Sequence, residues 1–283
     1  MPVVTADPLV STQWLAEHLR APDVRVVDAS WHMPAEGRDP RAEFAQAHIP
    51  GAVFFDIDEI SDTDSPLPHM LPSPEKFSSR VRKLGLGDGN RIVIYDNSAV
   101  HSAARVWWMF RYFGHRDVAV LDGGLAKWIA EGRPTDDLPQ MPRERHFTVR
   151  VDTTLVRDRT DMMRIVSDGG AQIVDARSRS RFRGDEPEPR EGLRSGHIPG
   201  ALNVPNGALF NEDGTYKSPD ALKQLFSEAG VDLAKPIVTS CGSGITACNL
   251  ALALHLAGAR QVAVYDGSWA EWGAGDETPV ETG

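Results

Sequence analysis

One cysteine occupies a position at which side-chain chemistry is expected. Cys241 directly follows the β-rich run 237–239, which reads as a short buried strand. Gly242 and Gly244 allow a tight turn that directs successive backbone N–H groups toward one point. Apolar residues recur at helical spacing from Ile245 onward. Because a helix N-terminus favours an anion, we expect the sulfur of Cys241 to be a thiolate, the form that acts as a nucleophile.

The alternative for Cys241 is a buried structural cysteine, which is the usual role of a free cysteine. The flanking Gly and Ser residues argue against it. The second cysteine, Cys248, lies on the apolar stripe of the expected helix and is assigned to the core. A disulfide between the two is not expected, because two helical turns separate them by roughly 10 Å and a disulfide needs Cα atoms within about 7 Å.

A segment rich in arginine, residues 175–192, follows another β-rich run. Its glycine and proline residues indicate a loop by composition. Two interpretations stay open. The loop is either solvated, with arginines that pair with Glu186, Glu188 and Glu191, or it binds an anion, because a planar guanidinium group matches a carboxylate. The arginines are Arg177, Arg179, Arg181, Arg183 and Arg190.

The sequence contains an internal repeat whose period is about half the chain. Short motifs recur in the same order, and the matched segments are 25–30 with 172–177, 47–52 with 196–201, 74–77 with 219–222, 92–98 with 237–243 and 118–128 with 262–272. Such a repeat indicates a tandem domain duplication. It places Asp96 opposite Cys241, so the first half is expected to be a non-catalytic copy.

Both halves alternate short β-rich runs with helical patterns. In the first half the expected strands are 24–27, 92–95 and 118–121, and the expected helices are 74–84, 103–113 and 125–132. This alternation predicts the α/β class, with a parallel sheet covered by helices on both faces in each domain. A proline-rich stretch between the halves reads as a linker. We assign residues 1–135 to the first domain, 136–155 to the linker and 156–283 to the second domain.

Length and composition narrow the class of protein. A chain of 283 residues accommodates two ordinary domains, and 41% hydrophobic with 25% charged residues is typical of a soluble globular protein. The formal net charge of −10 argues against nucleic-acid binding. Two cysteines, no signal-peptide pattern and no long apolar run lead us to expect a cytoplasmic protein that is not membrane-bound. No metal-ligand cluster, phosphate-binding loop or dinucleotide motif is recognised, so neither metal nor organic cofactor is expected.

The loop 241–246, Cys-Gly-Ser-Gly-Ile-Thr, resembles the active-site loop of the rhodanese superfamily. It is most similar to the loop of the 3-mercaptopyruvate sulfurtransferases, which reads Cys-Gly-Ser/Thr-Gly-Val-Thr, with Ile245 in place of Val. The resemblance extends along nearly the whole chain, through motifs such as Phe-Phe-Asp-Ile-Asp, His-Met-Leu-Pro and Tyr-Asp-Gly-Ser-Trp-Ala-Glu-Trp. It implies tandem rhodanese-like domains, of which only the C-terminal one carries the reactive cysteine.

The resemblance also implies roles for individual residues around the cysteine. Arg181 and Arg190 match arginines that hold the carboxylate and the keto oxygen of the substrate. For Arg177, Arg179 and Arg183 we keep the interpretation of solvated surface residues. Ser243 is expected to donate a hydrogen bond to the thiolate, the persulfide or the substrate. Backbone N–H groups are expected from the loop residues Gly242, Gly244, Ile245 and Thr246. For Thr246 a second possibility stays open, in which its side chain caps the following helix.

Two further residues come from the first half of the sequence. His69, in a proline-rich loop, would ordinarily be a surface or structural histidine. In the resembling family the matching histidine and aspartate reach toward the cysteine across the domain interface and assist proton transfer with the loop serine. His69 is therefore a candidate acid–base group, with Asp58 orienting it. His197, in contrast, belongs to a His-Ile-Pro-Gly motif present in both halves, so we expect it to stabilise a turn.

These features predict a sulfurtransferase that moves sulfur from 3-mercaptopyruvate, through a Cys241 persulfide, to a thiol, a thioredoxin-like protein or cyanide, and releases pyruvate. Thiosulfate is the alternative donor, although the neutral Gly242 and Ser243 stand where thiosulfate sulfurtransferases carry basic residues. A phosphatase is not expected, because Ala247 stands where the rhodanese-like phosphatases place an arginine. A non-catalytic binding module is the alternative of another class. We expect a monomer.

Overall fold

The computed structural model describes residues 7–283, which form two compact units. The first unit comprises the residues up to Thr63 together with Leu71–Asp152 and Asn211–Tyr216. The second unit comprises Asp64–Met70, Thr153–Phe210 and Lys217–Gly283. Each unit therefore includes a short segment from the opposite half of the sequence.

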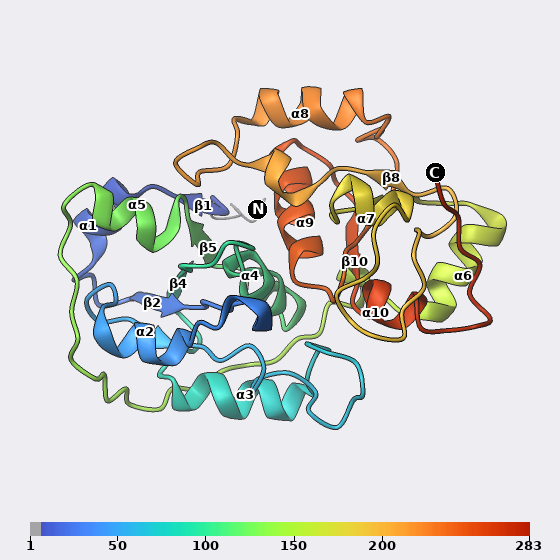
Figure 1. The fold of residues 1–283 in the computed structure, drawn as a ribbon. Coiled ribbons are helices and arrows are strands. Elements are labelled where there is room, and N and C mark those ends of the chain that lie inside the picture. The colour runs from blue at the N-terminus through green and yellow to red at the C-terminus, as the bar shows by residue number, and fades with distance from the viewer. Residues whose placement is uncertain (1–6) are drawn as a thin grey trace. The chain divides into compact units, whose positions relative to one another are not determined.

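The first unit is built on a parallel sheet with the strand order β1-β5-β4-β2-β3 in the described part of the chain (Figure 1). Its elements are β1 (Leu9–Val10), α1 (Thr12–His18), β2 (Val24–Asp28), η1 (Pro34–Glu36), α2 (Pro40–Gln46), β3 (Val53–Phe54), α3 (Pro74–Lys83), β4 (Arg91–Tyr95), α4 (Ala103–Tyr112), β5 (Val118–Leu121) and α5 (Gly124–Ala130). The expected strands and helices of this half are present, with ends that shift by one or two residues.

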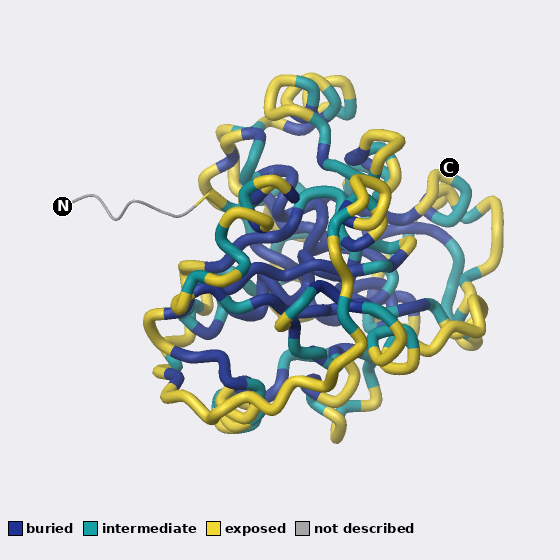
Figure 2. Tube along the Cα trace, turned by 90° about the vertical axis from the view of Figure 1, so that its left-hand side faces the viewer, coloured by how far each residue is buried: buried dark blue, intermediate teal, exposed yellow. Residues whose placement is uncertain are grey.

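Helices cover both faces of this sheet. Val93, Tyr95 and Leu121 pack in one cluster with Leu15 of α1 and Trp128 of α5. Side chains alternate between the two faces of a strand, so the neighbouring residues of β4 and β5 point to the opposite face. These neighbours are also buried, and they are Ile92, Ile94, Val118 and Val120. The central strands β2, β4 and β5 are mostly buried, and Figure 2 shows dark blue tubes at the centre of the molecule.

The second unit repeats this architecture with the order β6-β10-β9-β7-β8, again with parallel neighbours. Its elements are η2 (Thr153–Leu155), β6 (Val156–Arg157), α6 (Arg159–Asp168), β7 (Gln172–Asp175), α7 (Arg179–Arg183), β8 (Leu202–Asn203), η3 (Asn206–Leu209), α8 (Pro219–Glu228), β9 (Ile237–Ser240), α9 (Thr246–Leu256), β10 (Val262–Tyr265) and α10 (Ser268–Trp272). The predicted α/β fold with two sheet-containing domains is thus confirmed.

The repeat is visible in details of local structure. Helices α3 and α8 both begin with a proline that follows a capping serine. The hydroxyl of Ser73 accepts the N–H of Lys76 at 3.2 Å, and that of Ser218 accepts the N–H of Ala221 at 3.3 Å. Such caps satisfy N–H groups that the first turn of a helix leaves without partners.

The proline-rich stretch before residue 153 packs along the first unit. Phe147 is buried and lies 5.6 Å from Phe77 of α3 between ring centroids. The N–H of Asp88 donates to the carbonyl of His146 at 2.8 Å. Within residues 7–283, no helix is long and apolar enough to cross a membrane.

Candidate active site

Cys241 lies directly after β9, at the carboxyl end of a central strand, and α9 begins five residues later. Its sulfur accepts the backbone N–H of Gly244 at 3.1 Å. Gly244 has φ 84°, in the left-handed region that favours glycine, and this conformation turns its N–H back toward the sulfur. The structure thus shows one of the successive amides that the turn was predicted to direct at the cysteine. Cys241 is 2% exposed, more buried than its glycine-rich surroundings suggested.

The carbonyl groups of the loop point in another direction, toward α10. The N–H of Trp269 donates to the carbonyl of Cys241, and the N–H of Ala270 to that of Gly242, both at 2.9 Å. Because these carbonyls are bound by the first turn of α10, the loop backbone is fixed with its oxygen atoms away from the sulfur.

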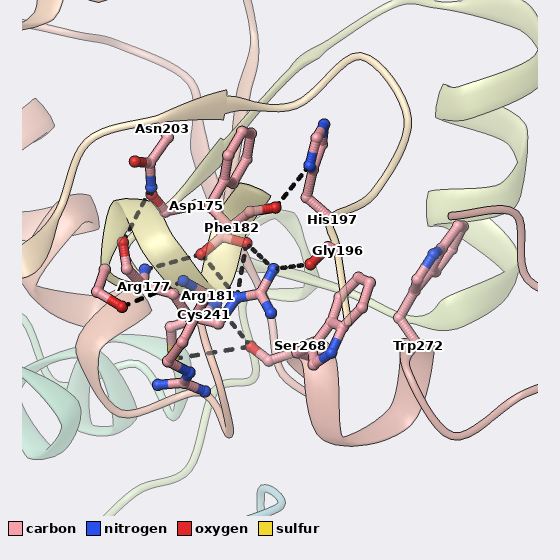
Figure 3. A network of polar contacts seen from close by, with 12 residues as sticks. Asp175, Arg177, Arg181, Phe182, Gly196, His197, Asn203, Cys241, Ser268 and Trp272 are labelled. Atoms are coloured by element: carbon pink, nitrogen blue, oxygen red, sulfur yellow. Dashed lines mark hydrogen bonds and ion pairs between the residues drawn. The ribbon is translucent and has the colours of Figure 1, made fainter. Parts of the chain in front are cut away.

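Ser268, the first residue of α10, was not expected to take part in this site. It is fully buried and has φ 49°, although it is not glycine. Its hydroxyl donates to the carbonyl of Tyr265 at 2.8 Å and accepts the N–H of Cys241 at 3.2 Å. The same oxygen lies 4.0 Å from the sulfur. A dashed line marks this contact in Figure 3. Since its single proton is used on Tyr265, Ser268 acts mainly by holding the backbone of the cysteine.

The arginine-rich segment is not a plain loop, which corrects the expectation from composition. Residues Arg179–Arg183 form the short helix α7. Ser178 caps it by accepting the N–H of Arg181 at 3.4 Å, and Gly184, with φ 80°, ends it. Ser178 and Gly184 are residue types that are typical of the start and the end of a helix. The proline residues that follow nevertheless led to the prediction of a loop.

Arg181 and Arg190 converge on the residue after the cysteine. A Cβ atom placed on Gly242 would lie 3.2 Å from Nη2 of Arg181 and 3.9 Å from Nη1 of Arg190. The absence of a side chain at Gly242 therefore lets two guanidinium groups approach the loop backbone closely. The structure brings together Cys241 and the two arginines assigned to substrate binding, and their binding role stays a prediction.

Arg177 is buried, which corrects the expectation of a solvated surface arginine. Its side chain is 1% exposed, and its Nε and Nη2 atoms bind Oδ2 of Asp175 at 3.0 and 2.8 Å. Figure 3 shows its guanidinium group between Asp175 and the carbonyl of Gly196, which it binds at 2.7 Å. The group also stacks on Trp269 at 4.2 Å. Burial acts to lower the pKa of Arg177, but the carboxylates of Asp175 and Glu188 outweigh it and raise the pKa.

The remaining loop residues are mostly buried, and the hydrogen bonds expected of them stay predictions. Ser243 is 8% exposed and Ile245 is 3% exposed. Ile245 occupies the position that precedes α9 and Thr246 is the first helical residue, so the possibility that Thr246 caps the helix is not borne out. Cys248 is fully buried, and its assignment to the core is confirmed.

His69 and Asp58 belong to different units. His69 lies in the segment Asp64–Met70 of the second unit, where it is buried and has φ 61°. Asp58 lies in the first unit, where its Oδ2 accepts the indole N–H of Trp31 at 3.0 Å. The structure thus assigns His69 to the unit of the cysteine, and the orientation of His69 by Asp58 stays a prediction.

His197 has the structural role expected from the repeat. Its Nδ1 lies 2.7 Å from the carbonyl of Phe182, and the two rings stack with centroids 3.8 Å apart. His48 makes the same contacts with Phe44 in the first unit, at 2.7 Å and 4.2 Å. Across residues 7–283, no group of three or more His, Cys, Asp or Glu side chains is arranged to hold a metal ion.

The first unit carries Asp96 at the place of the cysteine, directly after β4. Its carboxylate accepts the N–H of Ser98 at 3.0 Å and that of Ala103 at 2.8 Å. Burial raises the pKa of Asp96, and nearby His101 opposes this effect. In this unit the loop amides are therefore bound by a carboxylate of the chain itself.

The family model of the rhodanese-like domain matches residues 11–131 and 158–274. The two matches include strands β2 to β5 of the first sheet, β7 to β10 of the second, and the loops of Asp96 and Cys241. The chain therefore belongs to the family of proteins with rhodanese-like domains, and it contains two of them.

Individual relatives are sulfurtransferases. The chain is 47% identical to the human 3-mercaptopyruvate sulfurtransferase over 270 residues, which cover 93% of this chain and 91% of the relative. It is 46% identical to the thiosulfate sulfurtransferase of Gallus gallus, with 93% and 92% covered. Among solved structures, SseA from Escherichia coli, described as a 3-mercaptopyruvate sulfotransferase, superposes with a TM-score of 0.85 at 42% identity, covering 93% of this chain and 98% of SseA.

Proposed function

We propose that this chain is a 3-mercaptopyruvate sulfurtransferase that uses Cys241 as its nucleophile. The observation that carries the proposal is the convergence of two guanidinium groups, from Arg181 and Arg190, on Gly242, next to a cysteine whose sulfur accepts a backbone N–H. A 2-oxo acid that carries a thiol presents the matching groups, namely a carboxylate for the arginines and a sulfur atom for the cysteine.

In the first half-reaction the thiolate of Cys241 attacks the sulfur of 3-mercaptopyruvate. A sulfur–sulfur bond forms and the carbon–sulfur bond breaks, and the bonding electrons leave with the three-carbon fragment as the enolate of pyruvate. A proton then converts the enolate to pyruvate. The enzyme is left as a persulfide whose inner sulfur stays within reach of the Gly244 amide.

Ser243 and His69 are the proposed proton-transfer groups. Ser243 lies in the loop, two residues after the nucleophile, and His69 belongs to the same unit. Asp58 is proposed to orient His69. The amides of the loop residues Gly242, Gly244, Ile245 and Thr246 are proposed to stabilise the negative charge on the sulfur atoms.

In the second half-reaction an acceptor thiolate attacks the outer sulfur of the persulfide and regenerates the Cys241 thiolate. We propose a small thiol or a thioredoxin-like protein as the acceptor in the cell, with cyanide as a substitute in vitro. Two half-reactions through a covalent intermediate predict ping-pong kinetics. The proposed enzyme is a cytoplasmic monomer that needs no cofactor.

Thiosulfate is the second candidate donor, because relatives at similar identity are thiosulfate sulfurtransferases. Gly242 and Ser243 add no positive charge for a dianion, so we expect thiosulfate to be the poorer donor. A non-catalytic binding module describes the first unit, with Asp96, better than the second.

A donor comparison on the purified chain tests the proposal. We expect a higher kcat/KM for 3-mercaptopyruvate than for thiosulfate, with pyruvate formed in proportion to the sulfur transferred. Intact mass after donor treatment should increase by one sulfur, and Cys241→Ser should abolish the increase. Cys248→Ser is the matched control and should keep it. A chain that gains no sulfur from either donor would contradict the enzyme assignment.

A further inference from the structure

We infer that Glu188 sets the net charge beside the Cys241 loop and thereby favours a donor with one negative charge over a donor with two. The inference rests on the proposed sulfurtransferase function and adds a specificity-determining residue outside the cysteine loop. 3-Mercaptopyruvate carries one carboxylate and an uncharged thiol group, whereas thiosulfate is a dianion. The two donors therefore differ in how strongly they respond to a change of charge beside this loop.

Glu188 is a buried carboxylate that joins two arginines. Its side chain is 1% exposed. Oε1 accepts from Nη1 of Arg177 at 2.8 Å, and Oε2 accepts from Nη2 of Arg181 at 2.5 Å. A buried carboxylate needs such partners to remain charged. Glu188 therefore holds the guanidinium group of Arg181 at a defined position beside Gly242.

The contacts of Glu188 continue through Arg177 to the sheet. Asp175, the last residue of β7, binds Arg177 through both Nε and Nη2. Arg177 also binds the carbonyl of Gly196 and stacks on Trp269. Its donors are thus directed at protein groups. Arg181 is 20% exposed, in contrast to 1% for Arg177, so Arg181 is the member of the series that a small anion can reach.

Glu188 balances one positive charge beside Gly242. In the series of ion pairs, the carboxylates of Asp175 and Glu188 offset the guanidinium charges of Arg177 and Arg181. Replacing Glu188 by a neutral residue would remove the buried negative charge that Arg181 binds and would add one positive charge to the surroundings of Gly242. A dianion would gain more from this change than a monoanion.

The test is the ratio of two catalytic efficiencies, kcat/KM for thiosulfate over kcat/KM for 3-mercaptopyruvate. We expect Glu188→Gln to raise this ratio about tenfold, mainly through KM, because removing one charge at close range changes the binding of the two donors by different amounts. Glu188→Asp keeps the charge but shortens the side chain. It should lower both efficiencies and leave the ratio within about twofold of the wild type.

Glu186→Gln is the matched control. It removes the same charge two residues away, from an exposed side chain that accepts from Ser178 instead of from an arginine. For this variant, kcat/KM for thiosulfate divided by kcat/KM for 3-mercaptopyruvate should equal the wild-type ratio. Glu188→Ala provides a second neutral variant in case the Gln variant does not fold, because both remove the same charge while Arg177 keeps Asp175. Circular dichroism and a thermal melt establish which variant is folded.

The outcomes separate the inference from the function on which it rests. If both efficiencies of a folded neutral variant fall in parallel and the ratio stays constant, Glu188 is only structural and the inference is wrong. A ratio that rises equally in Glu186→Gln would also overturn it, because the effect would then come from general surface charge. If the wild-type chain itself gains no sulfur from either donor, the proposed function fails.

Discussion

The two loops that follow the central strands β4 and β9 share a backbone contact and carry different side chains at the strand end. The carbonyl of Asp96 accepts the N–H of Leu125 at 2.9 Å, and the carbonyl of Cys241 accepts the N–H of Trp269 at 2.9 Å. In both units the loop is thus held by the helix that follows the next strand. The side chain at the end of the strand differs, and with it the use of the loop.

Asp96 fills its own anion site. Its two carboxylate oxygens accept the amides of Ser98 and Ala103, so a carboxyl group of the chain itself occupies the position in which an anion would bind. Cys241 places a sulfur atom in that position, and in the proposed reaction this sulfur takes up and releases a second sulfur. The first loop is thus closed by its own side chain, whereas the second loop surrounds the proposed reacting atom.

The neighbouring charge is also reversed. Phe44 stacks on His48 and Phe182 stacks on His197, which makes the residues before the two phenylalanines structural counterparts. They are Glu43 in the first unit and Arg181 in the second. Glu43 binds Arg38 at 2.6 Å. The unit with Asp96 thus carries a glutamate, paired with Arg38, where the unit with Cys241 carries an arginine.

The largest expected effect comes from moving the cysteine. Asp96→Cys in a Cys241→Ser background should leave sulfur transfer about a thousandfold below the wild type, because a thiol in the first loop has Glu43 where the second loop has Arg181. Pyruvate release and intact mass after donor treatment measure the result. Asp96→Ser with Cys241 intact is the control and should stay within about threefold of the wild type. Recovery to about 1% of the wild-type rate or more would show that the loop alone determines activity.

A smaller effect is expected from exchanging Gly124 and Ser268, which begin α5 and α10 at matching positions. A Cβ on Gly124 would lie 2.5 Å from the carbonyl oxygen of Asp96, so Gly124→Ser should lower the free energy of unfolding by about 3 kcal/mol. Ser268→Gly should change it by no more than about 1 kcal/mol, because relief of the left-handed φ offsets the two lost hydrogen bonds. Urea denaturation measures both.

Gly51→Ser is the matched control for this exchange. Gly51 also has a left-handed backbone, with φ 80°, but a Cβ there would meet nothing within 4 Å. The difference between Gly124→Ser and Gly51→Ser isolates the collision with Asp96 from the cost of the backbone conformation. Equal destabilisation by the two substitutions would contradict the explanation.

The smallest expected effect concerns the aspartates that end β2 and β7. Asp28 and Asp175 each accept an N–H two residues ahead at 2.8 Å, but only Asp175 has an arginine, Arg177, as that partner. Burial raises the pKa of Asp28 to about 6 from 3.8. The folded state binds the proton of Asp28 more tightly than the unfolded state does. The contribution of protonated Asp28 to the free energy of unfolding is therefore complete below about pH 4 and is lost as the pH rises through 6.

Asp28→Asn removes this pH dependence. Relative to the wild type, the variant should gain about 2 kcal/mol in the free energy of unfolding between about pH 4 and pH 7.5. Urea denaturation at several pH values in this range measures the difference. Asp23→Asn, at an exposed aspartate near the start of the same strand, is the control. A difference between Asp28→Asn and the wild type that stays constant with pH would refute the assignment of the titration to Asp28.

Most of the fold could be predicted from the sequence because the two halves support each other. The strand 118–121 has the predicted bounds, and the strand of Ile237 extends by one residue to Ser240. The repeat alone also aligns Asp96 with Cys241, and each of them directly follows a central strand. Local patterns succeed here because the buried strands are short and rich in β-branched residues.

The arrangement around Arg177 could not be predicted in the same way. A segment with many arginines looks solvated by composition, and the partners that bury Arg177 are far apart in the chain, since Trp269 lies on α10. The repeat does show one difference at Ser268, because the first half has Gly124 at that position. The role of Ser268 depends on its left-handed φ and its contact with Cys241, and both arise only in the folded chain.

The exchange of short segments between the two halves has a consequence for anyone who divides this protein. The segment of His69 belongs to the second unit and the segment Asn211–Tyr216 to the first. A cut in the linker would therefore give two fragments, each of which lacks a piece of its own unit and carries a piece of the other. The two halves of the sequence reflect a duplication, but neither half contains all of one unit. Experiments that express, truncate or recombine this protein should therefore keep the whole chain.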